Sequence, residues 1–199
     1  EVFELLSPAM QSDLIRGLQD AEVTAIFANL DPDDRVWLLD ELPAALASRL
    51  LQGLTLKERH LTAEMLGYPK GSVGRRMTPE YVTAKADSTV SDALARVRAR
   101  IDEAETIYTL PVLDDSRRVV GIISLRDLLR AEPESQVSDV MQDPDMVIAY
   151  RSAEAAARMC ANLGHLALPI VDKESRLVGV LTIDDAAKIL QHEETEDAA

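Results

Sequence analysis

Residues 110–127, LPVLDDSRRVVGIISLRD, and residues 168–185, LPIVDKESRLVGVLTIDD, are copies of one another at a constant offset of 58 residues. Each copy is an apolar run, an acidic turn, a Val-Gly step, a second apolar run and a closing Ser/Thr-x-x-Asp. Two apolar runs joined by a short polar turn are typical of a β-hairpin. The alignment needs no gap, so the sequence predicts a duplicated hairpin module.

The duplication extends upstream of the hairpins. Residues 73–77 pair with residues 137–141 at an offset of 64, and residues 82–84 pair with residues 147–149 at an offset of 65. The larger offset places an insertion of about seven residues in the first copy, around residues 98–106. Each copy presents a sheet face that it cannot bury alone, so we expect the two copies to form one compact unit.

Apolar periodicity and turn residues predict the same order of elements in both copies, strand, helix, strand, strand, helix. In the first copy the elements are a strand at 81–84, a helix capped by Ser88, strands at 108–113 and 119–123, and a helix from about Leu125. The apolar face of the capped helix comprises Val90, Ala93, Leu94, Val97 and Ile101. In the second copy we expect strands near 146–149, 167–171 and 177–181, and helices near 153–163 and 183–192.

The first 70 residues follow a different pattern, a string of short amphipathic helices. Side-chain oxygens at a helix start accept orphan amide protons, and a proline at the first helical position loses no hydrogen bond. Such start signals occur at Ser7-Pro8, Asp20, Asp31-Pro32, Pro43 and the capping box Thr55-Leu-Lys-Glu58. A break at Gly67–Gly71 ends this pattern. We therefore predict an all-α superhelical domain at 1–70, repeats at 71–133 and 134–191, and a connecting segment at 192–199, an α+β fold overall.

Composition narrows the class of protein. The formal net charge of −14, from 35 acidic and 21 basic side chains, argues against nucleic acid as a partner, because binding phosphates needs a basic surface. The single cysteine, Cys160, rules out an internal disulfide and lies on the expected buried face of a helix. No apolar run reaches the roughly 18 residues of a membrane helix, and no signal peptide is present. The chain opens at Glu1 without a methionine, inside a helical pattern, which is typical of a fragment.

The two copies, residues 72–190, resemble a tandem pair of CBS domains. With the acidic helical stretch before them, the whole chain resembles the cytosolic half of MgtE-type magnesium transporters and channels. The phrases that carry this resemblance are Met77–Val82, Glu105–Tyr108, Ser124–Leu128 and the tail Glu193–Asp197. The resemblance implies a magnesium-sensing regulatory region on the cytoplasmic side of the cell membrane. It also implies a homodimer formed through the CBS domains and a transmembrane pore domain joined by a connecting helix.

The resemblance also implies where magnesium binds. Mg²⁺ prefers six oxygen ligands and keeps several waters, so one or two carboxylates per ion are enough. The implied carboxylates are Glu1 and Asp33 on the helical domain, Glu154 and Asp185 on the second CBS copy, and Glu193, Glu196 and Asp197 in the tail. Trp37, Lys188 and Gly164 depart from the family pattern at positions where an acidic residue is expected. We expect shifted sites there, with Asp34, Asp184 and Glu194 as substitutes.

A second interpretation is a nucleotide sensor, because CBS pairs commonly bind adenine nucleotides and some relatives bind ATP. In the closing Ser124-Leu-Arg126-Asp127, the hydroxyl suits a phosphate and the carboxylate suits the two ribose hydroxyls. Thr109 stands where an aromatic residue would stack on adenine, and His165 could stack instead. This interpretation makes Ser124, Arg126, Asp127 and Thr109 the candidate nucleotide residues and ATP a candidate ligand.

An enzyme is the interpretation that the sequence favours least. There is no Gly-rich phosphate loop, nucleophile elbow or Cys/His metal cluster, and the three histidines lie in unrelated contexts. A plain dimerisation module remains as a third class, because paired CBS domains would match a two-fold symmetric pore.

Overall fold

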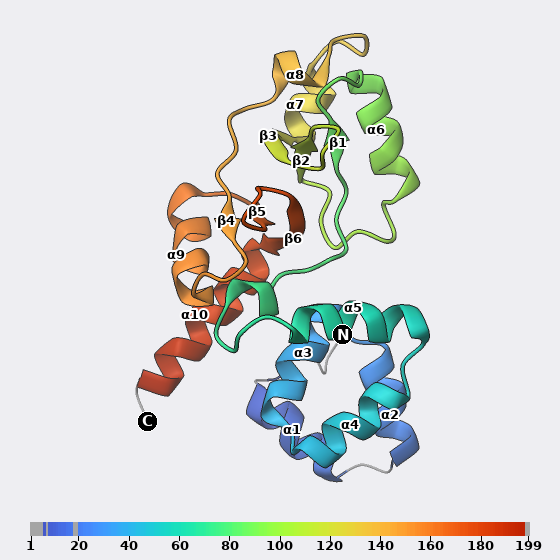
Figure 1. Cartoon of the computed structure of the whole chain (residues 1–199), viewed down its shortest axis with the longest axis vertical. Coiled ribbons are helices and arrows are strands. Elements are labelled where there is room, and N and C mark those ends of the chain that lie inside the picture. The colour runs from blue at the N-terminus through green and yellow to red at the C-terminus, as the bar shows by residue number, and fades with distance from the viewer. Residues whose placement is uncertain (1–5, 7, 18–19, 198–199) are drawn as a thin grey trace. The chain divides into compact units, whose positions relative to one another are not determined.

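The computed structural model describes Leu6, residues 8–17 and residues 20–197, and it divides into two compact units, residues 1–70 and residues 71–199 (Figure 1). The first unit is all helix, and the second combines two small sheets with helices. This mixture is the predicted α+β class. Among the described residues, no helix has the length and apolar character needed to cross a membrane.

The first unit consists of α1 (Pro8–Gly17), α2 (Asp20–Ala28), α3 (Pro32–Glu41), α4 (Ala44–Gln52) and α5 (Leu56–Leu66). All five helices begin at the predicted start signals. The capping box at Thr55 is complete, because the Glu58 amide donates to Thr55 Oγ1 over 3.3 Å and the Thr55 amide donates to Glu58 Oε2 over 2.8 Å. The Thr55 hydroxyl and the Thr55 amide both donate to the Glu58 carboxylate and lower the pKa of Glu58. Side-chain capping therefore sets where α5 starts, whereas α3 and α4 begin at their proline signals without a side-chain cap hydrogen bond.

The second unit contains two three-stranded sheets with the same topology. The first has the strand order β1 (Ala84–Lys85), β2 (Thr109–Leu113), β3 (Val119–Ser124), and the second has β4 (Val147–Ile148), β5 (Ala167–Val171), β6 (Leu177–Thr182). In both, the first pair of strands is parallel and the second is antiparallel. The helices are α6 (Val90–Ala99), α7 (Leu125–Arg130) and α8 (Val137–Val140), then α9 (Ala153–Leu163) and α10 (Ile183–Asp197). The predicted duplication is confirmed down to register, because both hairpins have an irregularity at the same step, Val112/Leu113 and Ile170/Val171.

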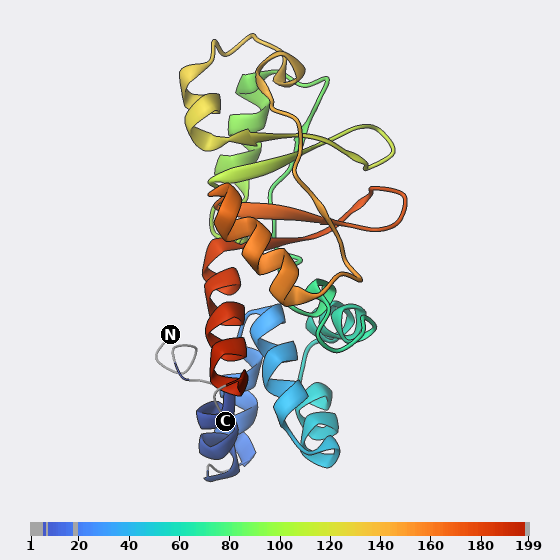
Figure 2. The ribbon, with the colours of Figure 1, turned by 90° about the vertical axis from the view of Figure 1, so that its left-hand side faces the viewer.

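The two hairpin turns lie side by side, as Figure 2 shows. The Val119 amide donates to the Ser175 carbonyl over 2.9 Å, and the Leu177 amide donates to the Arg117 carbonyl over 3.1 Å. Arg117 and Ser175 adopt positive φ angles of 63° and 62° at equivalent places in the two turns. The second unit is therefore organised around an approximate two-fold relation between the copies.

The segment that precedes each copy docks on the sheet of the other copy. The Thr78 amide donates to the Val180 carbonyl over 2.8 Å, and the Gln142 amide donates to the Ile122 carbonyl over 2.8 Å. Residue Gly179 lies beneath Met77 in this crossing, as Gly121 lies beneath Met141. Because each copy completes the other, we expect the pair to unfold as one unit.

Replacing Gly179 by alanine should destabilise the second unit. The added Cβ would lie 2.6 Å from Met77 Cγ and 3.0 Å from the Thr78 carbonyl oxygen, closer than packed atoms tolerate. Overpacking of this kind costs about 1–3 kcal/mol of unfolding free energy, which denaturant titration would measure. The double variant with Met77→Ala should lose less than the sum of the two single losses, because the clash is relieved. Additive losses would contradict this account.

Four details of the sequence prediction differ from the structure. The cap of α6 is Thr89 rather than Ser88, because Thr89 forms a full capping box with Asp92. Helix α6 ends at Ala99, so Ile101 lies outside the predicted apolar face and is half exposed. The strand predicted at 81–84 is reduced to Ala84–Lys85, preceded by a single bridge between Tyr81 and Thr106. The last helix is longer than predicted, because α10 continues to Asp197 rather than ending near residue 192.

Candidate functional site

The closing Ser/Thr-x-x-Asp of each hairpin forms the same local structure twice. Ser124 caps α7: its Oγ accepts the Asp127 amide over 3.0 Å and its hydroxyl donates to Asp127 Oδ2 over 2.6 Å. In the second copy, Thr182 makes the same two hydrogen bonds with Asp185, over 3.2 and 2.5 Å. Each carboxylate is therefore held at a helix start, where the helix dipole favours negative charge.

A pocket of about 830 Å³ adjoins the first of these two motifs. Its wall includes all four residues that the sequence assigned to a nucleotide, Thr109, Ser124, Arg126 and Asp127, together with His165 from the other copy. The structure thus gathers residues from both copies around one cavity, which we call the nucleotide-sized pocket because drug-sized and cofactor-sized ligands occupy about 300–1,000 Å³.

The nucleotide-sized pocket is more cationic than the chain around it. Arg126 and Arg130 line it and are exposed, and Arg130 Nη1 lies 3.8 Å from Asp127 Oδ1. Asp127 is the acidic residue in its lining. Two guanidinium groups against one carboxylate give a local excess of positive charge on a chain whose net charge is −14. Such a pocket favours an anionic ligand.

His165 also lines this pocket and is held by two contacts. Its Nε2 lies 2.8 Å from Asp145 Oδ2, and its carbonyl accepts a hydrogen bond from Cys160 Sγ over 3.4 Å. Cys160 is buried, as its place in the helix predicted, and burial raises the pKa of its thiol to about 11. The cysteine therefore acts as a packed, protonated support for the pocket wall rather than as a reactive thiol.

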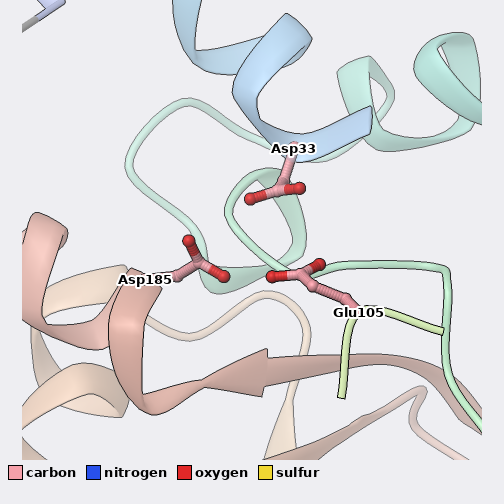
Figure 3. A group of neighbouring side chains, drawn as sticks. All are labelled: Asp33, Glu105 and Asp185. Atoms are coloured by element: carbon pink, nitrogen blue, oxygen red, sulfur yellow. The ribbon is translucent and has the colours of Figure 1, made fainter. Parts of the chain in front are cut away.

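The second copy differs in charge at one of the two positions that hold arginines in the first copy. At the offset of 58 residues, Arg126 becomes Asp184 and Arg130 becomes Lys188. Figure 3 shows Asp185 at the start of α10 and Glu105 on the segment before β2. A carboxylate oxygen of Glu105 lies within 4.8 Å of one of Asp185, and we call these two residues the acidic pair. The same scaffold thus has Arg126 in the first copy where the second copy has Asp184, and the second copy also has the acidic pair at its closing motif.

Two neighbouring residues contact the acidic pair, Lys188 at the Asp185 carboxylate and Glu80 at the Glu105 backbone. Lys188 Nζ lies 3.2 Å from Asp185 Oδ1, so a cation already shares this carboxylate. The Glu105 amide donates to the Glu80 carbonyl over 3.0 Å, which fixes the backbone that carries Glu105. The sequence prediction included Asp185 but did not include Glu105 as a candidate ligand. At the offset of 58 residues, Thr106 is the counterpart of Gly164, which lines the nucleotide-sized pocket. Glu105 directly precedes Thr106, and this position in the repeat is the signal that could have identified it.

The other carboxylates predicted for metal are carried by other elements of the chain or by other turns of α10. Asp33 lies in the first turn of α3 in the helical unit, with Asp34 beside it. Glu154 lies in the first turn of α9 and forms an ion pair of 2.8 Å with Arg158. Helix α10 carries the tail residues Glu193, Glu196 and Asp197, of which the side chains of the last two are outside the described part, as is Glu1.

Comparison with known families now places the chain. The model of the MgtE intracellular N domain matches residues 1–71, and the CBS domain model matches residues 71–134 and 137–192. A solved structure of the cytosolic domain of the Mg²⁺ channel MgtE in complex with ATP is 34% identical, covers 94% of this chain and 77% of that chain, and superposes with a TM-score of 0.85. The chain belongs to the MgtE family. It consists of that family's intracellular N domain followed by a pair of CBS domains.

Two further relatives agree with this assignment. The magnesium transporter MgtE of Thermus thermophilus is 36% identical over 205 residues, which cover 99% of this chain and 45% of the transporter. A solved structure of the soluble part of a magnesium transporter is 27% identical, covers 96% of this chain and 76% of that chain, and has a TM-score of 0.86. The chain spans less than half the length of the curated transporters that it matches.

Proposed function

We propose that this chain is the magnesium-sensing regulatory region of a magnesium transporter. The observation that carries the proposal is the acidic pair, Glu105 and Asp185, on a chain of net charge −14. Carboxylate oxygens are the protein ligands that Mg²⁺ prefers, and two of them suffice for an ion that keeps its remaining waters. The magnesium-transporter relatives make this cation the natural choice.

The spacing of the acidic pair suits such an ion. Oxygens bound at about 2.1 Å to one octahedral Mg²⁺ lie about 3 Å apart when adjacent and about 4.2 Å apart when opposite. The separation of at most 4.8 Å between Glu105 and Asp185 oxygens needs only a small side-chain adjustment to reach this range. Thr182 and Lys188 hold Asp185 in place while leaving lone pairs on both oxygens for a cation.

In this proposal, Mg²⁺ links the CBS pair to the helical domain. The candidate carboxylate of the helical domain is Asp33, and Glu1, Glu154, Glu193, Glu196 and Asp197 are candidates for further ions. At low magnesium the two acidic units repel one another, and at high magnesium their carboxylates are bridged and a compact form is favoured. A ligand that binds one arrangement better than another shifts the population toward it. The compact form would correspond to a closed pore.

Small-angle scattering across a magnesium titration tests this function. We expect the radius of gyration to fall as Mg²⁺ is added, with no fall in potassium chloride of equal ionic strength. The potassium control separates bridging from screening, because screening depends on ionic strength alone. An unchanged radius in Mg²⁺ would refute the sensing mechanism.

The nucleotide-sized pocket supports a second function, the binding of an adenine nucleotide such as ATP. Arg126 and Arg130 would face the phosphates, and Asp127 would accept hydrogen bonds from the ribose hydroxyls, since carboxylates and guanidinium groups suit these partners. The relative solved in complex with ATP makes this the natural ligand class. Binding would be regulatory, and we propose no catalysed reaction.

We further propose that the region acts as a homodimer joined to a transmembrane pore domain on the cytoplasmic side of the cell membrane. The relatives are membrane transporters about twice as long as this chain. Large apolar side chains are exposed on the CBS helices, including Leu129 on α7 at 66% and Leu163 on α9 at 46%. Burying such side chains between two copies would stabilise a dimer. The scattering experiment also reports the molecular mass that tests this association.

A further inference from the structure

We propose that His165 reads the base of the bound nucleotide and makes the pocket selective for adenine over guanine. This inference rests on the proposed nucleotide function of the same pocket. It concerns His165 and its partner Asp145, and it assigns each of them a role.

A planar side chain in the pocket lining is the natural group to contact a nucleotide base, and few lining residues have one. Thr109 is not aromatic, so the rings in the lining are those of Tyr108 and His165. Tyr108 is 60% exposed, whereas the His165 side chain is 23% exposed and is tied to Asp145. A ring that is already ordered loses less conformational entropy when it contacts a ligand. His165 is therefore the better placed of the two rings to contact a base.

Asp145 decides which nitrogen of His165 carries the proton. A carboxylate only accepts hydrogen bonds, so the contact of 2.8 Å requires Nε2–H to donate to Asp145 Oδ2. In the neutral imidazole, Nδ1 is then an acceptor. We infer that Nδ1, the ring nitrogen that Asp145 does not hold, faces the bound base and offers it an acceptor.

This tautomer distinguishes the two purines. Adenine carries an amino group at C6, which can donate to Nδ1, whereas guanine and hypoxanthine carry a carbonyl oxygen there, which would face another acceptor. A site built to hydrogen-bond one group rejects the analogue that leaves a polar atom unmatched. For a pocket that is partly open to solvent, we expect a preference for AMP over GMP of about tenfold.

Calorimetric titration with AMP, GMP and IMP at pH 8 tests the proposal. The wild-type chain should bind AMP about tenfold more tightly than GMP or IMP. Both His165→Ala and Asp145→Asn should bring this ratio close to one, the second because an amide can donate as well as accept and no longer fixes the tautomer. Asp143→Asn is the matched control: it removes an exposed carboxylate two residues away and should keep the ratio.

Each outcome either supports or overturns the base-reading role of His165. Equal affinities for AMP and GMP in the wild type, or a preference that survives His165→Ala or Asp145→Asn, would overturn the base-reading role while leaving nucleotide binding intact. Absence of binding by all three nucleotides would overturn both this inference and the nucleotide function. The Asp145→Asn variant keeps His165 in place, so the test stands even if His165→Ala disturbs the fold.

Discussion

Replacing Asp185 by lysine should abolish the magnesium-dependent compaction. The change removes one carboxylate of the acidic pair and places a positive charge close to Glu105, within the few ångströms that separated the two carboxylates. Lys188 already lies 3.2 Å from Asp185 Oδ1, so the variant would have two lysines where Mg²⁺ is expected to bind. Like charges at this distance oppose binding strongly. Scattering at saturating Mg²⁺ should show the same radius of gyration as scattering without it.

Two further variants separate the effect of the acidic pair from a general effect of net charge. Lys188→Met removes the cation that shares the Asp185 carboxylate, so compaction should begin at several-fold lower Mg²⁺. Glu174→Lys makes the same charge change as Asp185→Lys at an exposed turn of the same CBS copy and should leave the response nearly unchanged. Compaction that persists in Asp185→Lys would exclude the acidic pair as the site of the response. An identical loss in Glu174→Lys would show that net charge rather than the acidic pair controls it.

The energy that such a response requires argues for several ions. Shifting a two-state equilibrium from 1:99 to 99:1 takes roughly 5.5 kcal/mol of differential binding. A site that exists in only one state, with Mg²⁺ at ten times its dissociation constant, supplies about 1.4 kcal/mol. About four weak sites are therefore needed. The many candidate carboxylates of this chain suit that requirement better than one tight site would.

Much of the fold could be predicted because its causes are local. Helix starts such as Thr55-Leu-Lys-Glu58 are fixed by side chains three residues apart, and the hairpins by apolar runs around a polar turn. Even the capping motif shared by Asp127 and Asp185 was visible as a repeated Ser/Thr-x-x-Asp. A pattern repeated at a constant offset indicates that the same local interactions form in both copies.

The features that could not be predicted depend on contacts between residues far apart in the chain. The partnership of Glu105 with Asp185 and that of Asp145 with His165 each join segments that are neighbours only after folding. The crossing of Thr78 onto Val180 has the same character. Sequence periodicity reports burial and local hydrogen bonding, but it carries no information about which loop meets which helix start. The 58-residue offset is the available sequence signal for such contacts, because it relates each residue that lines the pocket to a counterpart in the other copy.

Replacing Asp127 by asparagine should weaken the binding of AMP by about tenfold or more. A hydrogen bond to a charged group is worth about 1.5–3 kcal/mol, and the carboxylate is the proposed acceptor for the ribose hydroxyls. The amide is isosteric and can still accept from the Ser124 hydroxyl, so α7 should remain capped. Calorimetric titration of AMP into both proteins measures the change.

The sign of this change separates ribose recognition from simple electrostatics. Asp127 is the acidic residue lining a pocket that also contains Arg126 and Arg130, so removing its charge raises the positive potential there. If the pocket attracted only the phosphate, Asp127→Asn would bind AMP more tightly, as would a control such as Asp115→Asn at an exposed turn. If Asp127 holds the ribose, 2′-deoxy-AMP should bind the wild type more weakly than AMP does and should show little further loss in Asp127→Asn. That non-additivity is expected only for two groups in direct contact. Tighter binding of AMP by Asp127→Asn would therefore exclude the ribose contact and leave the arginines as the recognition element of the pocket.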